Sequence, residues 1–145
     1  MTRLIARRPP TAGFVLSTNQ WTQPFWDAAR EHRLVAARCA ECGRFRMPPT
    51  PFCPNCRSQA IQWTTLSGLG IVYSYTVVSR AMLAGMDQYL PYVPAVISLP
   101  DAGGVRLVSN VVDAPIEEIR VGREVRVVWD DAPEGAVLPR FALVV

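Results

Sequence analysis

Four cysteines are the residues of this 145-residue chain whose spacing most clearly indicates chemistry. Cys39 and Cys42 form one C-x-x-C pair, and Cys53 and Cys56 form a second pair with the same spacing. Two intervening residues let both sulfur atoms of a pair point at one centre, and two such pairs complete a tetrahedral four-sulfur site. All four ligands are then protein groups, so no position is left for water or substrate. The pattern therefore predicts a structural metal site rather than a catalytic one.

Zinc is the metal that we expect at this site, and iron is the alternative, because tetrahedral thiolate geometry alone does not select between them. Disulfides fit poorly, since nothing in the sequence places the chain in an oxidising compartment. A redox-active C-x-x-C pair usually stands alone near a βαβ unit, whereas here two pairs fall within residues 39–56. Zinc binding would contribute directly to the free energy of folding.

A catalytic set of residues is missing from the sequence. His32 is the only histidine and lysine is absent, which excludes a pair of imidazoles and lysine Schiff-base chemistry. The thiols are committed to the metal, and the chain contains neither a G-x-S-x-G elbow nor a glycine-rich phosphate-binding motif. We therefore expect a chain that is not an enzyme on its own.

Ligand binding is better supported by the residue types than catalysis. Tyr73 and Tyr75 alternate along one predicted strand, so both rings lie on one face, either in the core, which we favour, or on an exposed stacking platform. Arginine side chains bind phosphate groups through forked hydrogen bonds. The candidates for such contacts are Arg44, Arg46, Arg80 and Arg106. Ser109 and Asn110 are either a polar end of a strand or a ligand contact, and the sequence leaves both open.

Four apolar side chains are candidates for contact with a partner protein. Phe25 and Trp26 lie near the start of a predicted helix, where they either pack on the cysteine-bearing region or insert into a partner's groove. Met82 and Met86 lie in an insert, residues 81–91, that interrupts the later strands and is predicted to be helical or mobile.

The elements that position these residues follow from the hydrophobic pattern. Residues 1–21 are predicted to form an extended arm. Residues 22–60 are predicted to hold a helix at 23–33, capped by Thr22, and two short strands around the first cysteine pair, which together make a zinc ribbon. In residues 61–145, several short strands are separated by turn signals such as Gly68-Leu69-Gly70, with one helical turn near residues 113–122.

This order predicts a mostly β chain: an N-terminal helix and zinc ribbon, followed by a five-stranded barrel of the OB-fold type. Half of the residues are apolar, as in a domain with a proper core. No apolar run reaches the roughly 20 residues of a membrane helix, and no secretory signal is recognisable, so we expect no membrane contact and a cytoplasmic protein. The net charge of +3 is spread along the chain, which weakens the alternative of a nucleic-acid-binding protein.

From about residue 20 onward the chain resembles the bacterial and archaeal family known as domain of unknown function 35. The resemblance rests on an ordered series of segments, which is more specific than the cysteine pattern alone. These are PFWDAAREHRLVAARCAECG, PPTPFCPNC, GIVYSYTVV, PYVPAVISL, RLVSNVVD, IRVGREVRVVW and LPRF. Members of that family combine a rubredoxin-like zinc ribbon with an OB-fold.

The resemblance, and not the composition, implies a function. Family members accompany thiolase-fold enzymes, including thiolases, acyltransferases and steroid side-chain retro-aldolases, and are thought to hold or channel acyl-CoA for them. The expectation is therefore a non-catalytic accessory subunit that binds acyl-CoA and stabilises a thiolase-fold partner in a hetero-oligomer. The alternative is a nucleic-acid-binding protein, since OB-folds and zinc ribbons also serve that purpose.

Overall fold

Two β-structures and one short helix make up the fold in the computed structural model, which describes residues 3–11, 15–133 and 135–145. The elements in chain order are α1 (Gln23–Arg30), β1 (Val35–Cys39), β2 (Phe45–Arg46), β3 (Ile61–Thr65), β4 (Leu69–Tyr75), β5 (Val93–Leu99), β6 (Val105–Val111), β7 (Glu124–Asp131) and β8 (Val137–Leu143). Three short 3-10 turns lie between them, at Asp87–Tyr89, Pro100–Ala102 and Ile116–Glu118.

Strands β4 to β8 form a closed five-stranded barrel in the order β4-β5-β6-β8-β7. Most pairs are antiparallel, and β6 meets β8 in parallel where Val111 faces Phe141. Along β5 the residues alternate strictly, so that Val93, Ala95, Ile97 and Leu99 point inward. Closure buries these side chains without leaving a sheet edge, as the sequence predicted.

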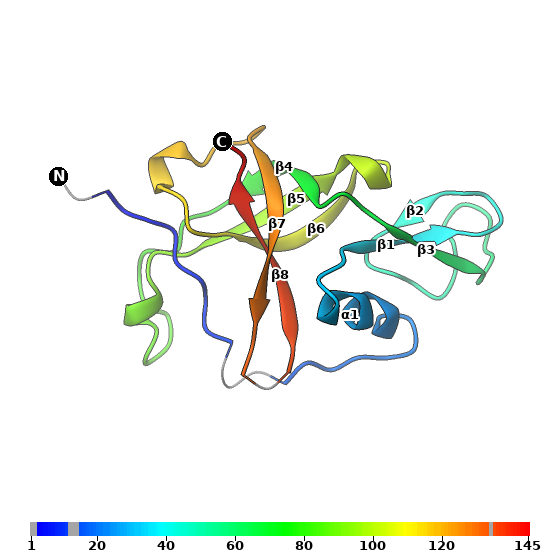
Figure 1. The fold of residues 1–145 in the computed structure, drawn as a ribbon, viewed down its shortest axis with the longest axis horizontal. Coiled ribbons are helices and arrows are strands. Elements are labelled where there is room, and N and C mark those ends of the chain that lie inside the picture. Colours follow the sequence, from blue (N-terminus) through cyan, green and yellow to red (C-terminus); the bar gives the residue numbers. More distant parts are fainter. Residues whose placement is uncertain (1–2, 12–14, 134) are drawn as a thin grey trace.

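The cysteine-bearing region is a separate three-stranded antiparallel sheet in the order β2-β1-β3. Figure 1 shows this sheet at one end of the molecule and the barrel at the other, with α1 between them beside β8. The predicted fold class is thus confirmed: a short helix and a ribbon precede a five-stranded barrel. Among the described residues, no helix is long and apolar enough to cross a membrane.

The first residues of the chain lie along the barrel instead of extending freely. Ala6 is fully buried, its amide donates to the Ala114 carbonyl, and its own carbonyl accepts from the Asp113 amide, both at 2.8 Å. Arg8 adds an ion pair to Asp113 at 2.9 Å. Of the predicted arm 1–21, residues 3–8 are therefore ordered against the barrel of the same chain and need no partner for that.

Helix α1 is shorter than predicted. It ends at Arg30 and not at residue 33, because His32 takes a left-handed backbone conformation with φ 56°. The amides of His32 and Arg33 turn back to the carbonyls of Ala29 and Ala28, which is the Schellman pattern that commonly ends a helix at glycine. The His32 ring then stacks on Trp129 and hydrogen-bonds Asp131 at 3.0 Å, so the helix end is attached to the barrel.

Gly70 allows β4 to approach β5 closely. A Cβ at this position would lie 2.4 Å from Cγ2 of Ile97 and 3.3 Å from the Ser98 carbonyl oxygen. Ile97 is fully buried and branched at Cβ, so it cannot easily move its methyl group away.

We therefore expect Gly70→Ala to lower the free energy of unfolding by about 1–3 kcal/mol through overpacking. Chemical denaturation monitored by circular dichroism measures the change. Ser74→Ala, at an exposed position of the same strand, is the control and should change stability by less than about 0.5 kcal/mol. A Gly70→Ala protein as stable as the original would contradict this account of the strand contact.

Candidate functional site

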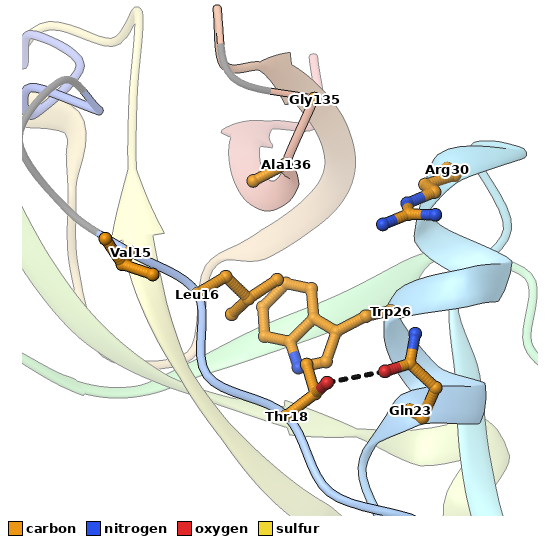
Figure 2. A pocket seen from close by; sticks show the side chains of 8 residues that line it. All are labelled: Val15, Leu16, Thr18, Gln23, Trp26, Arg30, Gly135 and Ala136. Carbon is orange, nitrogen blue, oxygen red and sulfur yellow. Dashed lines mark hydrogen bonds between the residues drawn. The ribbon is translucent and has the colours of Figure 1, made fainter.

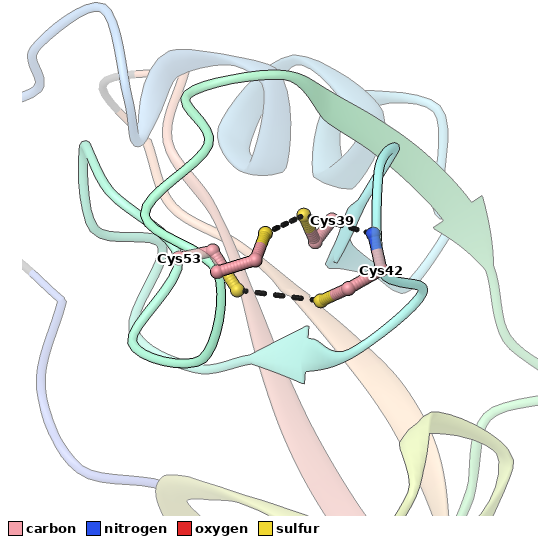
Figure 3. A group of neighbouring side chains, drawn as sticks. Cys39, Cys42 and Cys53 are labelled. Atoms are coloured by element: carbon pink, nitrogen blue, oxygen red, sulfur yellow. Dashed lines mark hydrogen bonds between the residues drawn. The ribbon is translucent and has the colours of Figure 1, made fainter.

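The four cysteine sulfurs converge on one point, as Figure 3 shows. All four lie within 4.8 Å of one another, with 3.5 Å between Cys39 and Cys56 and 3.6 Å between Cys42 and Cys53. A tetrahedral zinc ion with Zn–S bonds of about 2.3 Å separates its ligands by roughly 3.8 Å. The residues therefore fit a tetrathiolate metal site, in which Cys39 and Cys53 are buried and Cys42 and Cys56 are exposed.

Two matching turns hold these sulfurs in place. In the first, the Cys39 amide donates to the Arg44 carbonyl and the Gly43 amide donates back to the Cys39 carbonyl. In the second, Cys53 pairs in the same way with Ser58 and Arg57. Each turn needs one left-handed residue, which is Gly43 at φ 80° and Arg57 at φ 67°. The sequence indicated the glycine, but nothing in it marked the arginine.

The protein alone stabilises only part of the negative charge of four thiolates. The backbone amide of Cys42 lowers the pKa of the Cys39 thiol to about 6, and the amide of Cys56 lowers the pKa of Cys53. The Ser58 amide acts in the same direction on Cys56, but the neighbouring sulfurs, Cys39 first, and burial outweigh it and raise the pKa of Cys56 to about 12. A bound cation would stabilise all four groups in their ionised form.

Three of the four predicted phosphate-binding arginines come together. Arg44 and Arg46 from the ribbon and Arg106 from the barrel line one groove of about 460 Å³. Arg80 does not line it; it is exposed in the segment between β4 and β5.

The two tyrosines lie outside the barrel, so their expected place in the core is wrong. On β4, Gly70 and Val72 point inward, and a β-bulge between Val72 and Ser74 then interrupts the alternation, so that Tyr73, Ser74 and Tyr75 are all exposed. Tyr73 is 49% exposed and Tyr75 is 37% exposed. The guanidinium of Arg106 lies over the Tyr73 ring, 3.8 Å from its centroid.

Ser109 and Asn110 are buried and bind other parts of the barrel. The Ser109 hydroxyl donates to the Pro139 carbonyl at 2.7 Å, and the Asn110 side-chain oxygen accepts a short hydrogen bond from Arg140. The sequence left two roles open for this pair, a polar end of a strand or a ligand contact, and these hydrogen bonds fit the first. Neither residue lines the arginine groove.

Arg140 is a buried charge that the sequence analysis did not single out. Its Nε donates to Asp130 at 3.4 Å, and both side chains are nearly enclosed. Burial lowers the pKa of Arg140, while the negative charge of Asp130 acts in the opposite direction. A lone arginine in an alternating strand gave no signal of this role, because the partner side chains come from β6 and β7.

The predicted partner contacts divide into buried and exposed residues. Phe25 is in the core and packs edge-on against Trp26, with ring centroids 5.0 Å apart. Trp26 is half-buried and lines a pocket of about 240 Å³ together with Leu16 (Figure 2). Met82 is 82% exposed and Met86 half-buried. A contact with a partner therefore remains a prediction for Trp26 and the two methionines, whereas Phe25 presents little surface.

Metal removal tests the cysteine site. We expect one tightly bound metal ion per chain by elemental analysis, and Cys53→Ser should abolish it and unfold the ribbon, because metal binding in small zinc modules contributes on the order of 10 kcal/mol. Asn55→Ala, an exposed change between Cys53 and Cys56, is the matched control and should keep the metal. A metal-free protein with an unchanged unfolding transition would refute a structural metal.

The buried ion pair gives a second test. Asp130→Ala leaves the Arg140 guanidinium without its carboxylate and should lower the free energy of unfolding by about 3–5 kcal/mol. Asp131→Ala is the control, since that side chain is 66% exposed and its contact with His32 lies at the surface, worth about 1 kcal/mol or less. Equal losses in the free energy of unfolding for the two substitutions would show that the buried ion pair contributes no more stability than the surface contact.

Comparison with known protein families agrees with this division of the chain. Residues 26–62 match the model described as the ChsH2 rubredoxin-like zinc ribbon domain, and residues 63–130 match the ChsH2 C-terminal OB-fold domain. A solved structure described as an Ltp2–ChsH2(DUF35) aldolase contains a chain that superposes with a TM-score of 0.81 at 34% identity, covering 90% of this chain and 100% of that one.

Two curated proteins are similar to this chain in sequence. A probable enoyl-CoA hydratase alpha subunit of Thermomonospora curvata is 39% identical over 120 residues, which are 81% of this chain but only 36% of that protein. The chain thus spans about a third of the length of that relative. A DUF35 domain-containing scaffold protein of Methanocaldococcus jannaschii is 33% identical over 109 residues, 72% of this chain and 75% of the relative. Together with the ribbon, the barrel and the four clustered cysteines, these matches show that the chain belongs to the DUF35 family.

Proposed function

We propose that this chain is a non-catalytic accessory subunit of a hetero-oligomeric enzyme complex. The single observation that supports this most is the similarity, over 90% of the chain, to the ChsH2(DUF35) component of an aldolase that also contains Ltp2. The DUF35 relative of M. jannaschii is itself named a scaffold protein. Other relatives are named hydratase subunits, but this chain aligns with only about a third of one of these, so their activity is not carried over.

The residues support a structural role in such a complex. The strongest candidate for chemistry, the cysteine cluster, offers four protein ligands to a metal, and we propose that zinc fills it. When bound, zinc supplies a fixed cross-link between the two turns and no reaction step. The single histidine is tied to Asp131 and Trp129 and holds the end of α1.

The partner in this proposal is a thiolase-fold enzyme that performs carbon–carbon bond chemistry, and the ligand passed to it is an acyl-CoA. The family resemblance supports both assignments. The domain bounds that we propose, 22–60 for the ribbon and 61–145 for the barrel, make the chain a two-part adaptor. The arm at its N-terminus, residues 1–21, is partly docked on the barrel.

Co-purification tests the proposal. Co-expressed with a thiolase-fold enzyme from the same genome, the tagged chain should elute with that enzyme as one species and raise its stability or turnover. The chain alone should show no turnover of acyl-CoA substrates. Failure to associate, together with an enzyme whose activity is independent of this chain, would overturn the assignment, as would unaided turnover by the chain itself.

A further inference from the structure

The groove between the ribbon and the barrel concentrates positive charge from both structures. Arg44 and Arg46 reach it from the region of β2, and Arg106 reaches it from β6. Its volume is about 460 Å³, and no acidic residue is part of its lining. Within the described part of the chain, none of the three guanidinium groups forms a salt bridge.

Arg46 is the unusual member of this group because it is buried. Arg46 is only 5% exposed, and its Nε donates to the Thr50 carbonyl at 3.0 Å. The two remaining nitrogens, Nη1 and Nη2, are buried without a hydrogen-bond partner among the described residues. Buried polar groups in proteins are nearly always paired, and an isolated buried charge is costly. A negative charge in the groove would offset that cost.

Arg106 is held in position on the opposite side of the groove. Its guanidinium lies 3.8 Å from the centre of the Tyr73 ring, a cation–π contact that fixes a side chain otherwise free to move in solvent. Arg44 is exposed beside it on the ribbon. A concave, partly apolar surface lined by one sign of charge focuses its potential on a bound ion. Three arginines around one groove without an acidic residue therefore favour an anion there.

We propose that this groove binds the phosphate groups of a phosphorylated ligand. Phosphate suits it better than a single carboxylate, because Arg44 and Arg106 can donate to several oxygens at once and the buried charge of Arg46 lies beside them. The inference rests on the proposed function and deepens it, since an acyl-CoA carries its phosphates at the nucleotide end. It assigns that end to the junction of ribbon and barrel, so both parts of the chain are needed for binding.

Calorimetric titration of the metal-loaded chain with pyrophosphate, coenzyme A and 3′-dephospho-coenzyme A tests the groove. We expect coenzyme A to bind, and Arg44→Ala and Arg106→Ala each to weaken its binding by roughly tenfold or more, the value of a charged hydrogen bond. Arg120→Ala is the matched control, an exposed arginine outside the groove whose loss should leave affinity unchanged. Arg106→Lys should bind with intermediate affinity, because lysine keeps the charge but not the fork.

Two outcomes would overturn the proposal. One is equal affinity of coenzyme A for the original chain and for the Arg44→Ala and Arg106→Ala variants, or no binding at millimolar concentration. The other is a single-stranded oligonucleotide that displaces coenzyme A from the groove with a steep salt dependence, which would assign the surface to nucleic acid.

The same variants separate this inference from the proposed function. If the variants lose coenzyme A but still co-purify with the partner enzyme, the groove is confirmed and assembly is independent of it. If the original chain co-purifies with the enzyme but the arginine substitutions change no affinity, the groove assignment fails while the accessory role stands. Arg46→Met is measured only after its metal content and circular dichroism match the original, since that side chain is buried.

Discussion

Four cysteine sulfurs lie within 4.8 Å of one another, and four thiolates at that spacing would repel one another unless a cation lay between them. The sheet of the ribbon is small: β2 contributes two residues and β1 and β3 contribute five each. Such a sheet buries too little apolar surface to be stable alone. The ribbon therefore depends on its packing against the rest of the chain, where Val35 and Ala36 join the same buried cluster as the barrel residues, and in our proposal also on a metal.

The junction of these two parts combines structure with binding. Helix α1 packs between ribbon and barrel, and its end is fixed through His32 to Trp129 and Asp131. The arginine groove lies at the same junction. The ribbon places Arg44 and Arg46 in one groove with Arg106, so a metal in the cysteine site would act on this groove only through the placement of side chains.

The buried polar residues of the barrel have a different purpose. Arg140 donates hydrogen bonds to both Asn110 and Asp130, so one network joins three strands. Such a network costs desolvation, which its hydrogen bonds and ion pair offset. By contrast, Nη1 and Nη2 of Arg46 have no such partners among the described residues. Arg140 thus has its counter-charge within the fold, whereas Arg46 has none among the described residues.

The sequence by itself predicted the cluster of four cysteines and the series of strands that closes into a barrel. Cysteine spacing and the alternation of apolar residues are local patterns, so they can be recognised from the sequence alone. Only the tertiary structure decided what depends on residues far apart in the chain. The outward face of Tyr73 follows from the parity of β4 in a closed barrel, the early end of α1 from the left-handed turn at His32, and the pairing of Arg140 from strands β6 and β7. The meeting of Arg44 with Arg106 likewise arises because the ribbon packs beside the barrel, which no local pattern encodes.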